Sequence, residues 1–138
     1  MSTGAMAPQA MTSQQKAAAG LPQDDLIYWY PLNVTLTALQ AGVVATLQIL
    51  NDADFECRWI ISSQTGLWQA TLIDQLRSRP LMSSDINSEN LAGTAQLPFI
   101  LPKPWLLLRT STVKGTFTDR SNSGNTIQLC LVGYKLNL

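Results

Sequence analysis

The chain has 138 residues, of which 46% are hydrophobic and 13% are charged, and its nine basic and nine acidic residues cancel. This length fits a single domain, and the cancelled charge leaves no electrostatic footprint for nucleic acid or for an anionic membrane surface. Because the charged fraction is about half that of typical soluble domains, we expect much of the surface to be covered in use. A simple neutral monomer is the alternative.

The first 25 residues predict a flexible or extended N-terminal arm. Residues 1–25 are rich in Ala, Gln, Ser, Thr, Gly and Pro, show no apolar periodicity and contain a single basic residue, Lys16. This composition is typical of segments that bury too little apolar surface to fold alone. The segment also lacks a basic region followed by an apolar one, so we expect no secretory signal.

From Leu26 onward the sequence predicts one β domain, residues 26–138. Apolar and polar residues alternate with the period of a half-buried strand, and the predicted strand over residues 55–62 places Phe55, Cys57, Trp59 and Ile61 on one face. The predicted strands cover residues 26–32, 33–40, 43–50, 55–62, 67–76, 111–118 and 126–138. Turn signals separate them, and no long helix is expected. This pattern predicts an all-β fold, a single β-sandwich with jelly-roll or related Greek-key topology.

The stretch LPFILPKPWLLLR, residues 97–109, is apolar but interrupted by three prolines and Lys103. Proline disrupts a helix interior and a central strand, and the stretch is too short and too broken to span a membrane. We therefore expect an extended segment whose first half packs across the edge of the sandwich or against a neighbour and whose second half enters a sheet. A core strand with a proline bend is the alternative. Exposed apolar segments mark interaction sites, and two of the four tryptophans are expected in the core. The candidate interface residues are Trp29, Phe99, Ile100, Leu101, Trp105 and Leu106.

The residues offer little for catalysis or metal binding. The chain has no histidine, which removes the commonest general base and metal ligand. Cys57 and Cys130 lie in apolar runs, where we expect buried, reduced thiols. Asp52, Asp54 and Glu56 stand two apart, but the glycine and glutamate of a calcium-binding loop are missing from the required positions. We expect no enzymatic activity, no cofactor and no metal.

Residues 97–136 resemble a module of tailed-bacteriophage virion proteins. The elements that carry the resemblance are PFILPKPW, then TVKGTFTDRS, then a final strand ending in GYKL, in that order. Such modules occur in capsid cement or decoration proteins and in minor head or tail components. The resemblance covers under a third of the chain and transfers no catalytic residue.

The resemblance implies a non-enzymatic structural protein that binds the outer surface of a phage capsid and cements adjacent capsomers. It implies the phage major capsid protein as partner, synthesis in the host bacterial cytoplasm and a final place in the virion. A homo-oligomer is expected, with a dimer favoured over a trimer because closed dimers are the commonest oligomers. Two alternatives remain open: a jelly-roll module that binds a glycan or receptor through its aromatic residues, and a minor head–tail or tail component.

Overall fold

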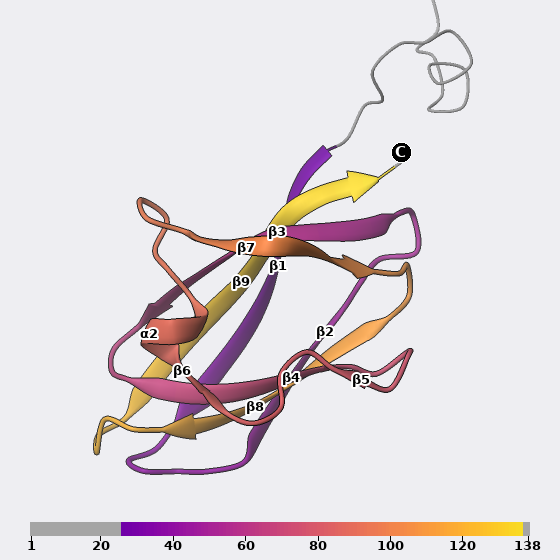
Figure 1. The fold of residues 1–138 in the computed structure, drawn as a ribbon. Coiled ribbons are helices and arrows are strands. Elements are labelled where there is room, and N and C mark those ends of the chain that lie inside the picture. The colour runs from indigo at the N-terminus through magenta and orange to yellow at the C-terminus, as the bar shows by residue number, and fades with distance from the viewer. Residues whose placement is uncertain (1–25, 137–138) are drawn as a thin grey trace, which may run out of the picture.

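The computed structural model describes residues 26–136 and is mostly β-structure (Figure 1). The arm predicted over residues 1–25 lies outside the described residues. The strands are β1 (Leu26–Leu36), β2 (Val43–Gln48), β3 (Asp54–Gln64), β4 (Trp68–Asp74), β5 (Arg79–Pro80), β6 (Ile86–Asn87), β7 (Phe99–Leu107), β8 (Thr112–Asp119) and β9 (Asn125–Leu136). One short helix, α2 (Ser88–Leu91), follows β6. Among residues 26–136, no helix has the length and apolar character needed to cross a membrane.

The strands form two antiparallel sheets that pack face to face. One sheet has the order β1-β9-β3-β7, and the other has the order β2-β8-β4-β5 with β6 also paired to β4. The chain crosses from one sheet to the other after each of β1, β2, β3, β6, β7 and β8. The predicted all-β sandwich is confirmed, and this strand order is that of a jelly roll.

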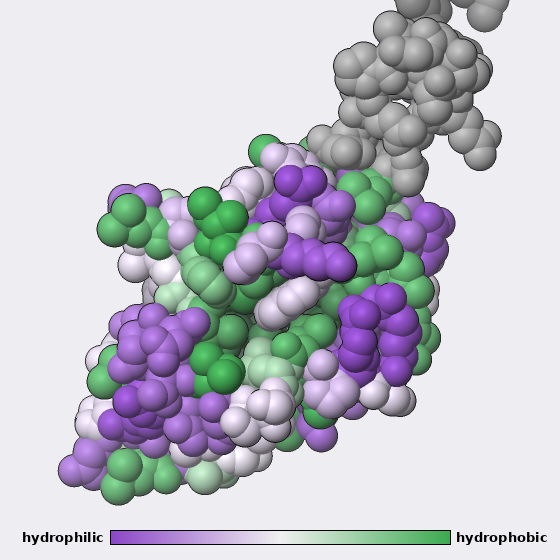
Figure 2. Space-filling model, viewed as in Figure 1, coloured by the Kyte–Doolittle hydropathy of each residue, from purple (hydrophilic) through white to green (hydrophobic). Residues whose placement is uncertain are grey.

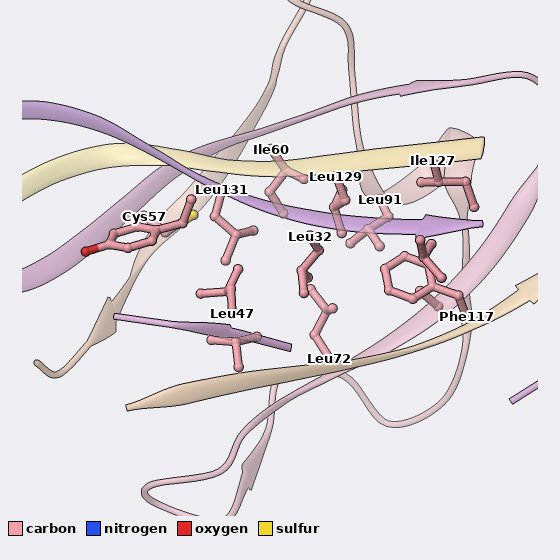
Figure 3. Close-up of a cluster of buried hydrophobic side chains, with 14 of the residues drawn as sticks. Leu32, Leu47, Cys57, Ile60, Leu72, Leu91, Phe117, Ile127, Leu129 and Leu131 are labelled. Atoms are coloured by element: carbon pink, nitrogen blue, oxygen red, sulfur yellow. The ribbon is translucent and has the colours of Figure 1, made fainter. Parts of the chain in front are cut away.

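The core lies between the sheets because alternate residues of each strand point inward. Figure 3 shows Leu47 and Leu72 from one sheet facing Leu32, Leu129 and Leu131 from the other. Trp68 is fully buried and packs against Phe117, with ring centroids 5.5 Å apart. Because the inner sides of the two sheets form the core, only the outer side of each sheet is available for contact with other molecules.

The first sheet is irregular where β3 passes Arg58. Along β9 the partners of β3 run from Gly133 opposite Cys57 directly to Val132 opposite Trp59, so Arg58 is the extra residue of a β-bulge. Along β7 the register jumps at the same point from Trp105 to Ile100. A Cβ added to Gly133 would collide with the Glu56 carbonyl oxygen. Glycine is therefore required where the chains approach most closely beside the bulge.

The same irregularity explains how β7 accommodates two prolines, Pro102 and Pro104. Pro102 and Pro104 lie in the part of β7 that the register jump leaves unpaired with β3, and β7 is an edge strand. Edge strands and bulges are the places where a sheet tolerates proline. The prediction that prolines exclude a central strand is consistent with this placement, and Trp105 to Leu107 pair with β3 as expected for the second half of the segment. Phe99 and Ile100 of the first half, which we did not expect in a sheet, pair with β3 as well.

Two details of the predicted strands are wrong. Residues 26–32 and 33–40 were expected as two strands, but β1 runs through both as far as Leu36. Trp59 and Ile61 were expected on the face of Phe55 and Cys57. The bulge at Arg58 moves Ile60 inward, where it is fully buried, and turns Trp59 and Ile61 to the opposite side.

Candidate functional site

The side of the β1-β9-β3-β7 sheet that points away from the core is unusually apolar, and we call it the outer face. Cross-strand partners lie on the same side of a sheet, so the pairing register defines its members. Its apolar members are Ile27, Trp29 and Pro31 of β1, Cys130, Val132 and Tyr134 of β9, Trp59 and Ile61 of β3, and Ile100 and Leu106 of β7. The charged Glu56 of β3 lies on the same face, opposite Tyr134 and Leu106.

One row of residues crosses all four strands of the outer face. Trp29 pairs with Val132, Val132 with Trp59, and Trp59 with Ile100. The side chains at the two ends of the row are open to solvent, since Trp29 is 55% exposed and Ile100 is 63% exposed. Two large apolar side chains therefore stand at opposite edges of one continuous surface. Contiguous apolar surface of this kind marks an interaction site.

The outer face has a polar boundary at one end. Asn33, Gln128 and Ser63 form the row beyond Pro31 and Cys130, and the Gln128 amide donates to the Asn33 carbonyl oxygen at 2.9 Å. At the other end, Trp59 packs edge-on against Tyr134 at 5.7 Å, and the Arg58 guanidinium lies 5.4 Å from the Tyr134 ring centre. An apolar centre with a polar rim is the usual composition of a protein interface.

The two thiols are buried and free, as predicted. Cys57 points into the core, where burial raises the pKa of its thiol to about 12. Cys130 lies on the outer face between Pro31 and Ile61, and burial raises its pKa as well. Both thiols stay protonated near neutral pH, and a protonated thiol is a poor nucleophile and metal ligand.

The predicted interface residues separate into exposed and buried groups. Trp29, Ile100 and Leu106 lie on the outer face, while Phe99 shares the inner side with Ile60 at the exposed edge of the sheet. Leu101 is only 8% exposed and belongs to the core.

The tryptophans divide differently from the sequence expectation. Trp105 is partly buried and packs against the core, whereas Trp59, expected in the core, stands on the outer face. Trp59 therefore joins Trp29 as an anchor candidate, and Leu101 leaves the candidate set. The bulge that moved Trp59 depends on the register of three strands, so alternation along β3 alone could not reveal it.

The carboxylates that suggested calcium have basic partners instead. Asp52 pairs with Lys135 at 2.8 Å, Asp54 with Arg109 at 3.4 Å, and Glu56 with Arg58. Lys135 is the buried member of its pair. Burial, the largest single influence, lowers its pKa, but the hydrogen bond to Asp52 and the electrostatic interactions with Tyr30, Asp52 and Tyr28 together outweigh this, so the net pKa is raised. Residues 26–136 contain no group of three His, Cys, Asp or Glu side chains placed to hold a metal ion.

Comparisons with protein-family models, with curated proteins and with solved structures found no match to this chain.

Proposed function

We propose that this chain is a non-enzymatic structural protein that binds the outer surface of a phage capsid and cements adjacent capsomers. The observation that carries the proposal is the outer face, where Trp29, Trp59 and Ile100 stand in one cross-strand row. Fold alone does not define function, so the proposal depends on this surface and on the resemblance of residues 97–136 to phage virion modules.

Cementing would act through many modest contacts per copy. Burying a large apolar side chain contributes roughly 2 kcal/mol, so the exposed parts of Trp29, Trp59 and Ile100 supply an attachment of useful strength at each site. Large aromatic side chains also lose little conformational entropy on binding, which makes tryptophan a frequent interface anchor. Repetition over a symmetric shell multiplies the small gain of each copy.

A symmetric dimer is part of the proposal. Closed two-fold association is the commonest oligomeric form of soluble proteins, and the outer face is continuous enough to serve both a second copy and the major capsid protein. Analytical ultracentrifugation of the full chain distinguishes a dimer from a trimer and from a monomer. A monomer at all accessible concentrations would remove the dimer from the proposal while leaving capsid attachment to be tested separately.

The test of capsid binding uses a matched pair of variants and purified particles from which the chain has been stripped. Ile100→Ser removes an exposed β-branched residue from the outer face. Val44→Ser, the control, removes a 51% exposed β-branched residue from β2 in the opposite sheet. We expect Ile100→Ser, and more strongly Trp29→Ser, to weaken rebinding to particles, while Val44→Ser rebinds like the unmodified chain.

Copy number separates the proposal from its alternatives. A cement protein occurs in hundreds of copies per particle, whereas the symmetry of tails limits a tail or receptor-binding protein to a few or to dozens. Low copy number, or rebinding that is indifferent to Ile100 and Trp29, would overturn the cement assignment. Binding of an oligosaccharide array that is lost in Trp29→Ser would favour the glycan-binding alternative.

A further inference from the structure

A second surface, separate in chemistry from the apolar face, lies at the open side of the sandwich where both sheets end. The edge strands β5 and β7 and the turn before β5 enclose a cleft of about 430 Å³. We call it the basic cleft. It is lined by Arg77, Arg79, Pro80, Leu81, Lys103, Pro104, Trp105 and Leu106. In Figure 2, strongly hydrophilic surface lies over the β5 hairpin and over β7, with apolar surface between them.

The charge of the cleft has one sign. Three of its lining residues are cations and none is acidic. Arg77 is neutralised by the buried Asp74, whose carboxylate accepts from the Arg77 Nε at 3.1 Å. Arg79 and Lys103 have no carboxylate partner among residues 26–136. Two positive charges that no carboxylate of residues 26–136 neutralises therefore line one small space.

Arg77 is held in place as part of the wall. Its guanidinium donates to Asp74 and also to the carbonyl oxygen of Leu106 on β7. This ties the turn before β5 to the edge strand of the other sheet. A guanidinium has five N–H donors, so the fixed side chain keeps donors for a ligand in the cleft. A pre-positioned arginine fork suits a carboxylate better than a mobile point charge does.

We infer that the basic cleft binds the carboxylates of an acidic peptide segment. Arg79 and Lys103 supply the charge, Arg77 supplies fixed donors, and Trp105 with Pro80 and Pro104 supplies apolar walls for the peptide's side-chain methylenes. The volume lies within the usual range of ligand-binding pockets. The cleft shares only Leu106 with the outer face and differs from it in chemistry, so its occupancy by a peptide does not require capsid binding.

The distribution of the remaining cations argues against nucleic acid. Arg58, Arg109, Arg120 and Lys135 each pair with a carboxylate, and Lys114 lies on β8 in the middle of the other sheet. A polyphosphate gains affinity from a row of basic contacts along its backbone. Within residues 26–136 no row of further unpaired basic residues extends from the cleft. A short acidic peptide can bind within the cleft alone and needs no such row.

The test measures binding of a capped hexaglutamate peptide to the full-length chain by titration calorimetry and by NMR. The Trp105 indole N–H signal, assigned with a Trp105→Phe variant, reports occupancy of the cleft. Arg79→Gln and Lys103→Gln each remove one charge from the cleft, and Lys114→Gln removes one charge elsewhere. All three residues are partly or fully exposed, so thermal unfolding of each variant is expected to match that of the unmodified chain.

We expect saturable binding that moves the Trp105 signal, weakens about fivefold in each cleft variant and weakens further at high salt. Lys114→Gln should bind as the unmodified chain does, and capped hexaglutamine should not bind. Absence of saturable hexaglutamate binding at low salt would overturn the inference. So would equal weakening in Lys114→Gln. Tighter binding of an oligothymidylate at the same residues would replace the peptide assignment with a nucleic-acid one.

Discussion

Ile100 and Leu101 are neighbours in β7, and their side chains point to opposite sides of the sheet. Ile100 is 63% exposed on the outer face, and Leu101 is 8% exposed in the core. Replacing each by alanine removes the same number of carbon atoms from adjacent positions of one strand. Because the backbone context of the two positions is nearly the same, comparing the two variants tests which side of β7 faces the core and which side faces a partner.

The expected magnitudes follow from the two exposures. Truncating a buried leucine to alanine costs 2–5 kcal/mol, and because Leu101 lies in an edge strand that can relax we expect about 2–3 kcal/mol. Ile100 has little more than a third of its surface buried. Replacing Ile100 by alanine therefore lowers the free energy of unfolding by about 1 kcal/mol or less, including the loss of the strand preference of isoleucine. The free energies of unfolding should differ by about 2 kcal/mol, or about 8 °C in Tm for a domain of this size.

Urea unfolding followed by circular dichroism, together with calorimetry, gives both quantities. Equal m-values in the two variants and the unmodified chain establish that the unfolded states are comparable. Particle rebinding, measured well below either Tm, should show the opposite order, with Ile100→Ala the weaker binder. Equal destabilisation by the two substitutions would refute the assignment of Leu101 to the core and Ile100 to the outer face.

Three further substitutions test local features of the fold. Gly133→Ala should destabilise by about 2 kcal/mol or more, because the new methyl group meets the Glu56 carbonyl beside the bulge; urea unfolding measures this. Thr110→Asn should stabilise by about 1 kcal/mol, since Thr110 adopts a φ of 66° that a β-branched residue tolerates poorly; the gain appears as a raised Tm. Asp119→Asn should flatten the acid limb of the stability curve, followed as Tm between about pH 2 and 5.

The sign for Asp119 follows from its partners. The Ser121 hydroxyl donates to the carboxylate, which outweighs the opposing effect of burial and lowers the pKa of Asp119 to about 2. A group whose pKa is lower in the folded state contributes stability above its unfolded pKa, and that contribution is lost as the pH falls toward the folded value. The unmodified chain should lose Tm more steeply than Asp119→Asn over this range. Parallel acid limbs would contradict the role assigned to Asp119.

The strands could be predicted because a strand with one buried side has alternating apolar and polar residues in its sequence. In β8, Val113 and Phe117 point inward as the alternation indicates, and in β4 Trp68, Ala70 and Leu72 do so. Each of these strands is regular, so period-two alternation holds from one end to the other. The number and spacing of the strands predict only a class of topologies, the jelly roll and related Greek keys. The order of the strands within the two sheets comes from the structure.

The irregular positions could not be predicted from local alternation. Arg58 is inserted in β3 next to Cys57, which pairs with a glycine of β9, and beside the part of β7 that contains two prolines and is not paired with β3. These three strands are separated by tens of residues in the sequence. One inserted residue reverses every later side chain of a strand, and this moved Trp59 from the expected core to the outer face. The basic cleft was missed for a related reason, since Arg79 and Lys103 meet only when β5 and β7 become the edges of stacked sheets.

The outer face and the basic cleft share one strand, and this connects the two proposals. Ile100 and Leu106 of β7 belong to the outer face, while Trp105 and Leu106 line the cleft. A partner that covers the outer face and carries an acidic segment can reach the cleft by following β7. Two weak contacts on one rigid strand reinforce each other, because the first raises the effective concentration for the second. Under the two proposals neither surface needs high affinity alone: the apolar row would supply attachment, and the cleft would select a partner whose acidic segment lies beside the apolar contact.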